Sequence, residues 1–281
     1  MFRVDEYIVA ETIEHALDLI ERYKDAIFIA GATDVYVQKK GCLDPLVLID
    51  ISRIKDLKGI KEENGMIRIG SVTTISEICS SEIIKNKASV LYDAAQVMGS
   101  PEIRNMATLG GNIANASPVA DTLPPLFVLD AVVSLVSKNG KRRIKIEDFP
   151  IAPGISIKKR EELIENIEFP CMKETSKGFY LRLGTRKALT ISKVGVAFLC
   201  DFKENRIINP RIALGSVAPK VIRAKNTEKY LDGKILSKET ISKAVNMIKN
   251  DASPITDYRS TKEYREAMTG ELLSMGLMEW I

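Results

Sequence analysis

The stretch with the clearest chemical meaning runs from Thr108 to Pro125 and reads TLGGNIANASPVADTLPP. Two adjacent glycines, Gly110 and Gly111, are followed by short polar side chains, and prolines close the segment. Glycine lets the backbone approach a ligand closely, and successive N–H groups in such a turn form a concavity that binds anions. The ligand that this pattern indicates is a phosphate or pyrophosphate. The alternative is a purely structural turn, because Gly-Gly and Asn are ordinary turn formers.

A second loop of similar character lies upstream at residues 27–35, which read IFIAGATDV. An apolar, strand-like run ends there in a turn of small and polar residues, so two such loops can hold two ends of one cofactor. The donors offered to a pyrophosphate are backbone N–H, hydroxyl and amide groups. They belong to Gly31, Ala32, Thr33 and Asp34 in the upstream loop, and to Thr108, Gly110, Gly111 and Asn112 in the downstream loop.

Other familiar sites are missing from the sequence. There is no Gly-x-Gly-x-x-Gly and no Gly-Lys-Ser/Thr, so neither a Rossmann nor a P-loop phosphate site is offered. His15 is the only histidine, and the four cysteines stand singly without a Cys-x-x-Cys pair. A histidine-based triad, a zinc ribbon and an iron–sulfur ligand run are therefore disfavoured. We assign no catalytic residue and no metal ligand.

The two loops together resemble the FAD-binding medium subunit of the molybdenum hydroxylases. This family includes the flavin subunits or domains of xanthine dehydrogenase, carbon monoxide dehydrogenase and related aromatic or aldehyde oxidoreductases. The motifs that carry the resemblance are Ala-Gly-Ala-Thr-Asp at 30–34 and Thr-Leu-Gly-Gly-Asn-Ile-Ala-Asn-Ala-Ser-Pro-x-x-Asp at 108–121. The resemblance covers nearly the full chain. One departure is Ala32, where many relatives have glycine; we expect this residue at negative φ, where a methyl group is tolerated.

The resemblance implies a subunit that binds FAD noncovalently, with the redox chemistry carried by the flavin. It also implies partner chains: a molybdopterin-binding large subunit oxidises the substrate, and a small subunit with two-iron two-sulfur clusters passes electrons. The FAD then delivers them to NAD or another acceptor. Two other interpretations remain open, a stand-alone FAD-dependent oxidoreductase with its own substrate pocket, and a nucleotide-binding scaffold module.

The resemblance also implies the residues of the site. Asp121 is expected to bond a sugar hydroxyl of FAD, unless it is only a capping or turn aspartate. Met98 is placed against the flavin ring, Ile164 near the cofactor, Arg182 where a relative has lysine, and Ile191 beside the isoalloxazine; an ordinary position on a strand face is the alternative for Ile164 and Arg182. The full cofactor-binding set is Ile29, Ala30, Gly31, Ala32, Thr33, Asp34, Val35, Met98, Thr108, Gly110, Gly111, Asn112, Asp121, Ile164, Arg182 and Ile191.

The elements that must position the first loop form a small α/β unit. Thr12 can cap a helix whose apolar residues recur at helical spacing. A strand is expected at 26–30, then a short helix at 35–40 closed by Gly41, and a buried strand at 46–50. The glycine loop at 31–34 thus connects a strand to a helix.

The rest of the chain predicts a mixed sheet with helices, followed by a C-terminal sheet with a helical layer. Strands are expected at 66–70, within 126–136, at 142–149 and at 163–170, with helices at 72–78 and 88–98. The segment 101–107 leads into the double glycine, which is expected to be a turn. Three more strands, at 178–186, 194–202 and 211–217, precede helices at 225–231, 237–250 and 261–275.

These elements define an α+β fold class with two domains. With the resemblance, residues 1–172 form a two-part FAD-binding domain of the PCMH type, with subdomains at about 1–55 and 56–172. Residues 173–281 form a C-terminal flavoprotein domain built on a three-stranded sheet with a helical layer.

Composition agrees with an ordinary globular protein. The 281 residues are 45% hydrophobic and 28% charged, and the net charge of +4 is too mild to indicate a nucleic-acid partner. The first residues are acidic where a signal peptide would be basic, and no apolar run reaches the length of a membrane span. We therefore expect a cytoplasmic protein whose cysteines stay reduced.

Overall fold

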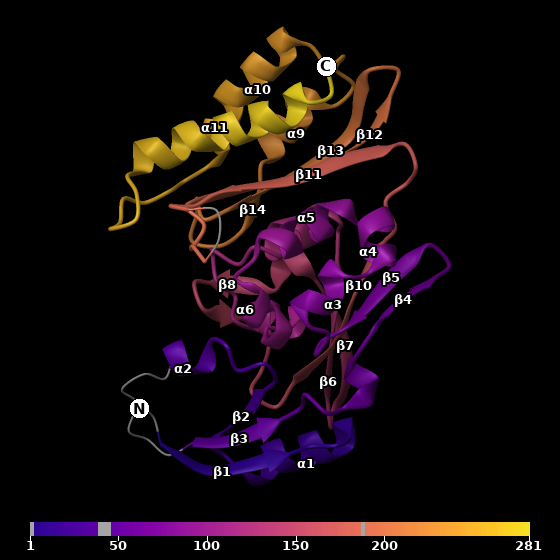
Figure 1. The fold of residues 1–281 in the computed structure, drawn as a ribbon, viewed down its shortest axis with the longest axis vertical. Coiled ribbons are helices and arrows are strands. Elements are labelled where there is room, and N and C mark those ends of the chain that lie inside the picture. Colours follow the sequence, from indigo (N-terminus) through magenta and orange to yellow (C-terminus); the bar gives the residue numbers. More distant parts are fainter. Residues whose placement is uncertain (1–2, 39–45, 187–188) are drawn as a thin grey trace.

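The computed structural model describes residues 3–38, 46–186 and 189–281. Its elements stack in three units along the long axis (Figure 1). The N-terminal unit, from β1 to β3, lies at one end, the central unit, from β4 to β10, lies in the middle, and the C-terminal unit, from β11 to α11, lies at the other end. The arrangement confirms the predicted α+β class.

The N-terminal unit is a small parallel sheet covered by one helix. Its strands pair in the order β1-β3-β2, and α1 begins at Thr12, whose side chain accepts a hydrogen bond from the N–H of His15. Both the cap and the apolar stripe agree with the sequence prediction. The end of the predicted helix at 35–40, with Gly41, lies outside the described residues. The elements are β1 (Val4–Val9), α1 (Ile13–Arg22), β2 (Ala26–Ile29), α2 (Val35–Gln38) and β3 (Leu46–Asp50).

The central unit holds a five-stranded sheet with the order β4-β5-β10-β6-β7. The sequence predicted a mixed sheet, but every adjacent pair in it is antiparallel, and parallel pairing is confined to the N-terminal unit. Short hairpins explain this, since a tight turn such as Asn64-Gly65, with φ of 53° and 75°, can join only antiparallel strands. The strands are β4 (Ile60–Glu63), β5 (Met66–Gly70), β6 (Val132–Ser137), β7 (Gly140–Lys145) and β10 (Leu163–Pro170).

Helices of the central unit cover one side of this sheet, and four of them, α4, α6, α7 and α8, were not predicted as helices. The segment before the double glycine is a helix, because Ser100 caps it and Pro101 occupies its first turn. Residues 123–128 are also helical, although 126–128 fall within the segment 126–136 where a strand was expected. The helices are η1 (Lys55–Leu57), α3 (Ile75–Cys79), α4 (Glu82–Lys87), α5 (Ser89–Val97), α6 (Pro101–Met106), α7 (Leu109–Ala114), α8 (Leu123–Val128) and η2 (Ile146–Asp148). Two short strands, β8 (Pro150–Ala152) and β9 (Ile155–Ser156), follow them.

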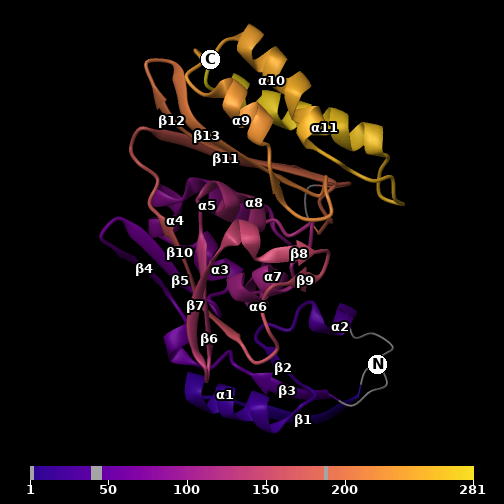
Figure 2. The same cartoon turned by 180° about the vertical axis from the view of Figure 1, so that it is seen from behind.

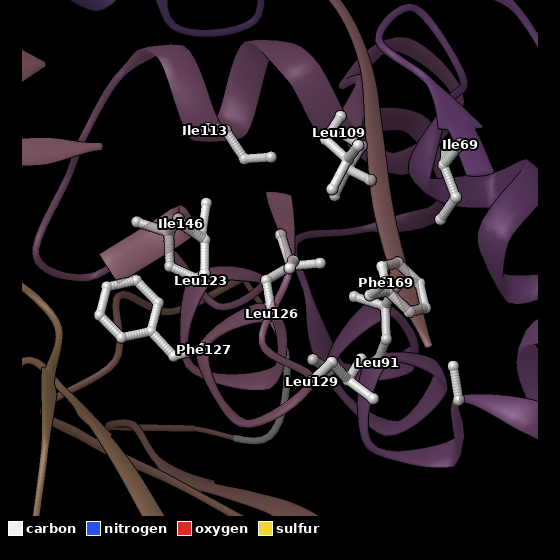
Figure 3. Packing of buried hydrophobic residues seen from close by; sticks show 14 of the residues in the cluster. Ile69, Leu91, Leu109, Ile113, Leu123, Leu126, Phe127, Leu129, Ile146 and Phe169 are labelled. Atoms are coloured by element: carbon white, nitrogen blue, oxygen red, sulfur yellow. The ribbon is translucent and has the colours of Figure 1, made fainter. Parts of the chain in front are cut away.

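The double glycine stands at the start of a helix rather than in an open turn. Thr108 is the N-cap of α7, and its side chain accepts a hydrogen bond from the N–H of Gly111. Leu109 and Ile113, one helical turn apart, are fully buried and point into the central core (Figure 3). Two glycines lower the helix propensity of so short a segment, and this packing outweighs that cost.

The C-terminal unit contains the three predicted strands and one more. A two-residue strand, β14, pairs with β13, so the sheet has four strands in the order β11-β12-β13-β14. Helices α9, α10 and α11 cover its outer face, and α5 and α8 of the central unit lie under its inner face (Figure 2). The elements are β11 (Ser176–Leu183), β12 (Val194–Lys203), β13 (Arg206–Gly215), β14 (Ile222–Arg223), α9 (Lys225–Leu231), α10 (Lys238–Asp251) and α11 (Lys262–Met278).

Side-chain alternation in β11, β12 and β13 explains why this sheet is covered on both faces. Successive strand residues point to opposite sides, so one set packs on the central unit and the other on the helices. The first set includes Tyr180, Ala197, Leu199 and Ala213. The second includes Phe179, Val196, Phe198, Ile212 and Leu214. The C-terminal unit is thereby fixed to the central unit through a shared hydrophobic core.

Candidate functional site

The two glycine loops face each other across a cleft of about 640 Å³. One wall is the loop that follows β2, from Ala30 to Asp34, together with Val35 of α2. The other wall is formed by α7 and by the segment 117–120 that follows it. The sequence prediction that both loops belong to one site therefore agrees with the geometry of the structure.

Gly31 lets the first loop lie directly against the end of α6. A Cβ atom on this residue would lie 1.6 Å from the carbonyl oxygen of Met106 and 3.1 Å from the nitrogen of Ala107. Both are backbone atoms at the end of α6, so no side-chain rotation would relieve the clash. Glycine at position 31 is thus required for the close approach of the first loop to the central unit.

The first loop also supplies unpaired donors. In the described part of the chain, the N–H groups of Gly31, Ala32 and Thr33 form no hydrogen bond. Ala32 has φ of 53°, so the expectation that it lies at negative φ is wrong. A left-handed residue in a turn is the geometry that directs successive N–H groups into one anion-binding concavity, which explains why a strained alanine is found here.

The double glycine does not supply the backbone donors that the sequence predicted. The N–H of Leu109 donates to the carbonyl of Thr73, and that of Gly110 donates to the carbonyl of Ser71. The N–H groups of Gly111 and Asn112 donate to the side chain and the carbonyl of Thr108. Each is therefore already paired within the protein, and the start of α7 serves to dock the helix.

The two glycines instead provide space. A Cβ on Gly110 would lie 2.6 Å from the Cβ of Ser71, so glycine there permits α7 to approach the end of β5. A Cβ on Gly111 would meet only the Oγ1 of Thr108, at 2.9 Å. Gly111 lines the cleft, and nearby the side chain of Asn112 accepts a bond from Thr122, leaving its Nδ2 amide as a donor toward a ligand.

A smaller cavity of about 320 Å³ adjoins the cleft and shares Ile29, Ala30, Thr108 and Gly111 with it. Its walls are mainly apolar and come from β2 and from the start of β10, including Ile164. The structure thus brings Ile164 into the candidate site, as the resemblance implies.

Four polar residues of the smaller cavity escaped the sequence prediction, namely Arg160, Glu162 and the two described next, Ser71 and Lys158. The Oγ of Ser71 is buried and has no hydrogen-bond partner among the described residues. Burial lowers the pKa of Lys158, whose amine donates to the carbonyls of Lys159 and Glu162 at 3.0 Å each. Neither Ser71 nor Lys158 belongs to a recognisable motif, and the one available signal was that Ser71 directly follows a predicted strand.

Three of the expected site residues, Asp121, Arg182 and Ile191, do not line either cavity. Asp121 is buried, and its carboxylate accepts hydrogen bonds from Tyr180 at 2.8 Å, Ser192 at 2.6 Å and Arg182 at 2.9 Å. Ile191 is 49% exposed. The proposed bond from Asp121 to a sugar hydroxyl stays a prediction, although both carboxylate oxygens already have partners in this structure.

The remaining lining of the cleft combines apolar and neutral polar residues and is almost uncharged. Met98, Asn115 and Ser117 contribute to it. Among the described residues that line the cleft, Asp34 is the single charged one. An anion bound here would therefore be held by backbone and neutral side-chain donors rather than by lysine or arginine.

Other sites are less suited to a ligand. A second interdomain cavity of about 620 Å³ has four basic and four acidic side chains among its lining residues, so it offers no net charge to attract an ion. In residues 3–38, 46–186 and 189–281 no three His, Cys, Asp or Glu residues are grouped to hold a metal. Across the same residues, no helix has the length and apolar character needed to span a membrane.

Comparisons with known proteins identify the family of the chain. A family model described as the FAD binding domain in molybdopterin dehydrogenase matches residues 1–172, and one described as the CO dehydrogenase flavoprotein C-terminal domain matches residues 179–280. The chain is 31% identical over 281 residues to the xanthine dehydrogenase FAD-binding subunit of Escherichia coli O157:H7, covering 98% of this chain and 96% of the relative.

Carbon monoxide dehydrogenase is similar in both sequence and structure. The medium chain from Hydrogenophaga pseudoflava is 28% identical over 274 residues, covering 97% of this chain and 95% of the relative. A solved structure of carbon monoxide dehydrogenase from the same organism superimposes with a TM-score of 0.93 at 28% identity, covering 98% of this chain and 96% of that one. On these matches, the chain belongs to the family of FAD-binding medium subunits of the molybdenum hydroxylases.

Proposed function

We propose that this chain binds FAD in the cleft and serves as the electron-transfer subunit of a molybdenum hydroxylase complex. Electrons pass from the iron–sulfur clusters of a small partner subunit through the FAD to NAD or another acceptor, while a molybdopterin-binding large subunit oxidises the substrate. The observation that carries the proposal is the row of unpaired N–H groups at Gly31, Ala32 and Thr33 on the wall of the cleft.

The residues of the cleft fit a pyrophosphate. Uncharged donors can stabilise the negative phosphate oxygens through hydrogen bonds, which are stronger than usual when the acceptor is charged. The hydroxyl of Thr33 and the amide of Asn112 add to the three N–H groups on the same cleft. The side chains of Asn115 and Ser117 complete this set.

The two cavities fit the two ends of a dinucleotide. We assign the adenine to the smaller cavity, where the apolar walls suit a flat ring and the orphaned hydroxyl of Ser71 supplies a polar partner. We assign the isoalloxazine ring to the end of the cleft that Met98 and Ala120 line. A thioether is a favourable neighbour for an aromatic ring.

The flavin supplies the redox chemistry when it is bound, and the protein supplies its position and surroundings.

The domain division at residue 172, with subdomains at about 1–55 and 56–172, is part of this proposal. A cytoplasmic location is supported by Cys79, Cys171 and Cys200, which are free thiols.

The first test is the visible absorption spectrum of the purified full chain and the identity of the nucleotide released on heating. We expect the two bands of oxidised flavin, and FAD rather than FMN in the supernatant. A colourless chain that takes up no FAD, alone or with its copurified partners, would contradict the proposal. Oxidation of an organic substrate by the isolated chain would favour the stand-alone oxidoreductase instead.

A further inference from the structure

Asp121 lies at the centre of a buried hydrogen-bonded group that joins the central and C-terminal units. Its Oδ1 accepts from the hydroxyl of Tyr180 at 2.8 Å and from the hydroxyl of Ser192 at 2.6 Å. Its Oδ2 accepts from the Nη1 of Arg182 at 2.9 Å. Asp121, Tyr180 and Ser192 are 8%, 5% and 2% exposed. We call these four residues the Asp121 network.

Arg182 extends the network to two further segments of backbone. Its Nη2 donates to the carbonyl of Val97, at the end of α5, and its Nη1 also donates to the carbonyl of Thr190 at 3.2 Å. The guanidinium is planar and its donors are fixed relative to one another. One side chain therefore sets the relative positions of α5, Asp121 and the segment before β12.

The bonds of the network leave little freedom to rearrange. Burial, and then the neighbouring Asp121, raise the pKa of Tyr180 well above its ordinary value of 10.0, so the phenol keeps its proton and donates a hydrogen bond to the carboxylate. Removing one donor leaves a buried carboxylate with fewer partners, which is unfavourable in a medium that excludes water. The network thus favours a single arrangement of the segments that it joins.

Two of the segments held by the network each contribute their neighbouring residue to the lining of the cleft. Met98 directly follows Val97, Ala120 directly precedes Asp121, and both line the cleft. These two lining residues of the central unit are in this way fixed by groups that do not themselves line the cleft.

We propose that Tyr180 and Ser192 are positioning residues for the flavin ring. Through Asp121 and Arg182 they hold in place the wall of the cleft formed by Met98 and Ala120. This inference rests on the proposed FAD site, and it adds that the C-terminal unit shapes the ring-binding end of the cleft.

The test removes one hydroxyl at a time from the full chain. The site variants are Tyr180→Phe and Ser192→Ala. Ser176→Ala is the matched control, because it also removes a hydroxyl that donates to an aspartate, Asp201, away from the cleft. For each variant we would measure the dissociation constant of FAD by titration, the visible spectrum and midpoint potential of the bound flavin, and the melting temperature of the apoprotein.

We expect each site variant to raise the dissociation constant about tenfold, equivalent to about 1.4 kcal/mol, and to shift the flavin bands and midpoint potential. The control should keep wild-type affinity and spectrum even if its melting temperature falls. If the site variants lose only melting temperature, the network is merely structural and the proposal is overturned. Should Tyr180→Phe fail to fold, Ser192→Ala decides the matter. A wild-type chain that binds no FAD refutes the proposed function itself, which is a distinguishable outcome.

Discussion

The sharpest single perturbation of the candidate site is Gly31→Ala. The added methyl would lie 1.6 Å from the carbonyl oxygen of Met106, whereas Cβ atoms in proteins essentially never approach another heavy atom within 3.0 Å. The first loop must therefore move away from the end of α6 by more than an ångström. That movement displaces the unpaired N–H groups of Ala32 and Thr33 from the opposite wall of the cleft.

The size of the effect follows from the donors that are displaced. A hydrogen bond to a charged group contributes about 1.5–3 kcal/mol, so loss of one N–H donor to a phosphate oxygen corresponds to a rise of roughly 10- to 150-fold in the dissociation constant of FAD. The backbone clash also strains the fold, at a cost of about 1–3 kcal/mol. Affinity and stability are both expected to fall.

Titration of the apoprotein with FAD, followed by flavin fluorescence, measures the affinity, and urea unfolding measures the stability. The matched control is Gly65→Ala in the β4–β5 hairpin, where φ is 75° and nothing lies within 4 Å of the added methyl. That variant strains the backbone without touching the cleft, so its FAD affinity should equal that of the wild type. Wild-type affinity in Gly31→Ala would refute the role assigned to the first loop.

Three further predictions follow from other contacts. Ala32→Gly should raise the free energy of unfolding by up to about 1 kcal/mol in urea titrations, because glycine relieves the strain at φ 53°. Gly276→Ala should lower that free energy by about 1–3 kcal/mol and spare FAD affinity, since the methyl would lie 2.3 Å from the ring of Phe179. Two hydrogen bonds from Arg142, at 2.6 and 2.8 Å, are the main cause that lowers the pKa of Glu162 below its ordinary 4.5. The contribution of Glu162 to the free energy of unfolding is therefore complete above about pH 4.5, and it is lost as the pH falls through the lower pKa of the folded state. In Glu162→Gln, the free energy of unfolding should therefore fall less steeply as the pH is lowered through this range.

Local sequence patterns predicted the order of the elements well, because capping residues and hydrophobic periodicity act over a few residues. The Thr12 cap and the strand at 46–50 are examples. The helical state of the double glycine was not predictable in this way. It depends on the burial of Leu109 and Ile113 in a core formed by distant residues, and the local glycine pattern favours a turn.

The candidate site was predictable as a pair of loops but not in its details. The sign of φ at Ala32 depends on how the loop docks on Met106, which no local pattern encodes. The partners of Asp121 lie about 60 to 70 residues further along the chain, and they reach it only because β11 and β12 pair in one register. The bond from Asp121 to a sugar hydroxyl, which the resemblance implies, stays a prediction, whereas the contacts of this carboxylate with the C-terminal unit could not be predicted from the sequence.

The walls of the cleft come from segments that are far apart in the chain, and this has a thermodynamic consequence. A cofactor bound between Gly31 and Gly111 links the N-terminal and central units, so it binds the folded chain and not the unfolded one. Such a ligand adds RT ln(1 + [L]/Kd) to the free energy of unfolding, about 2.7 kcal/mol at a hundredfold excess over Kd. The melting temperature then depends on the concentration of free cofactor. In a cell that degrades unfolded chains, the supply of FAD would set how long each copy of the subunit survives before assembly.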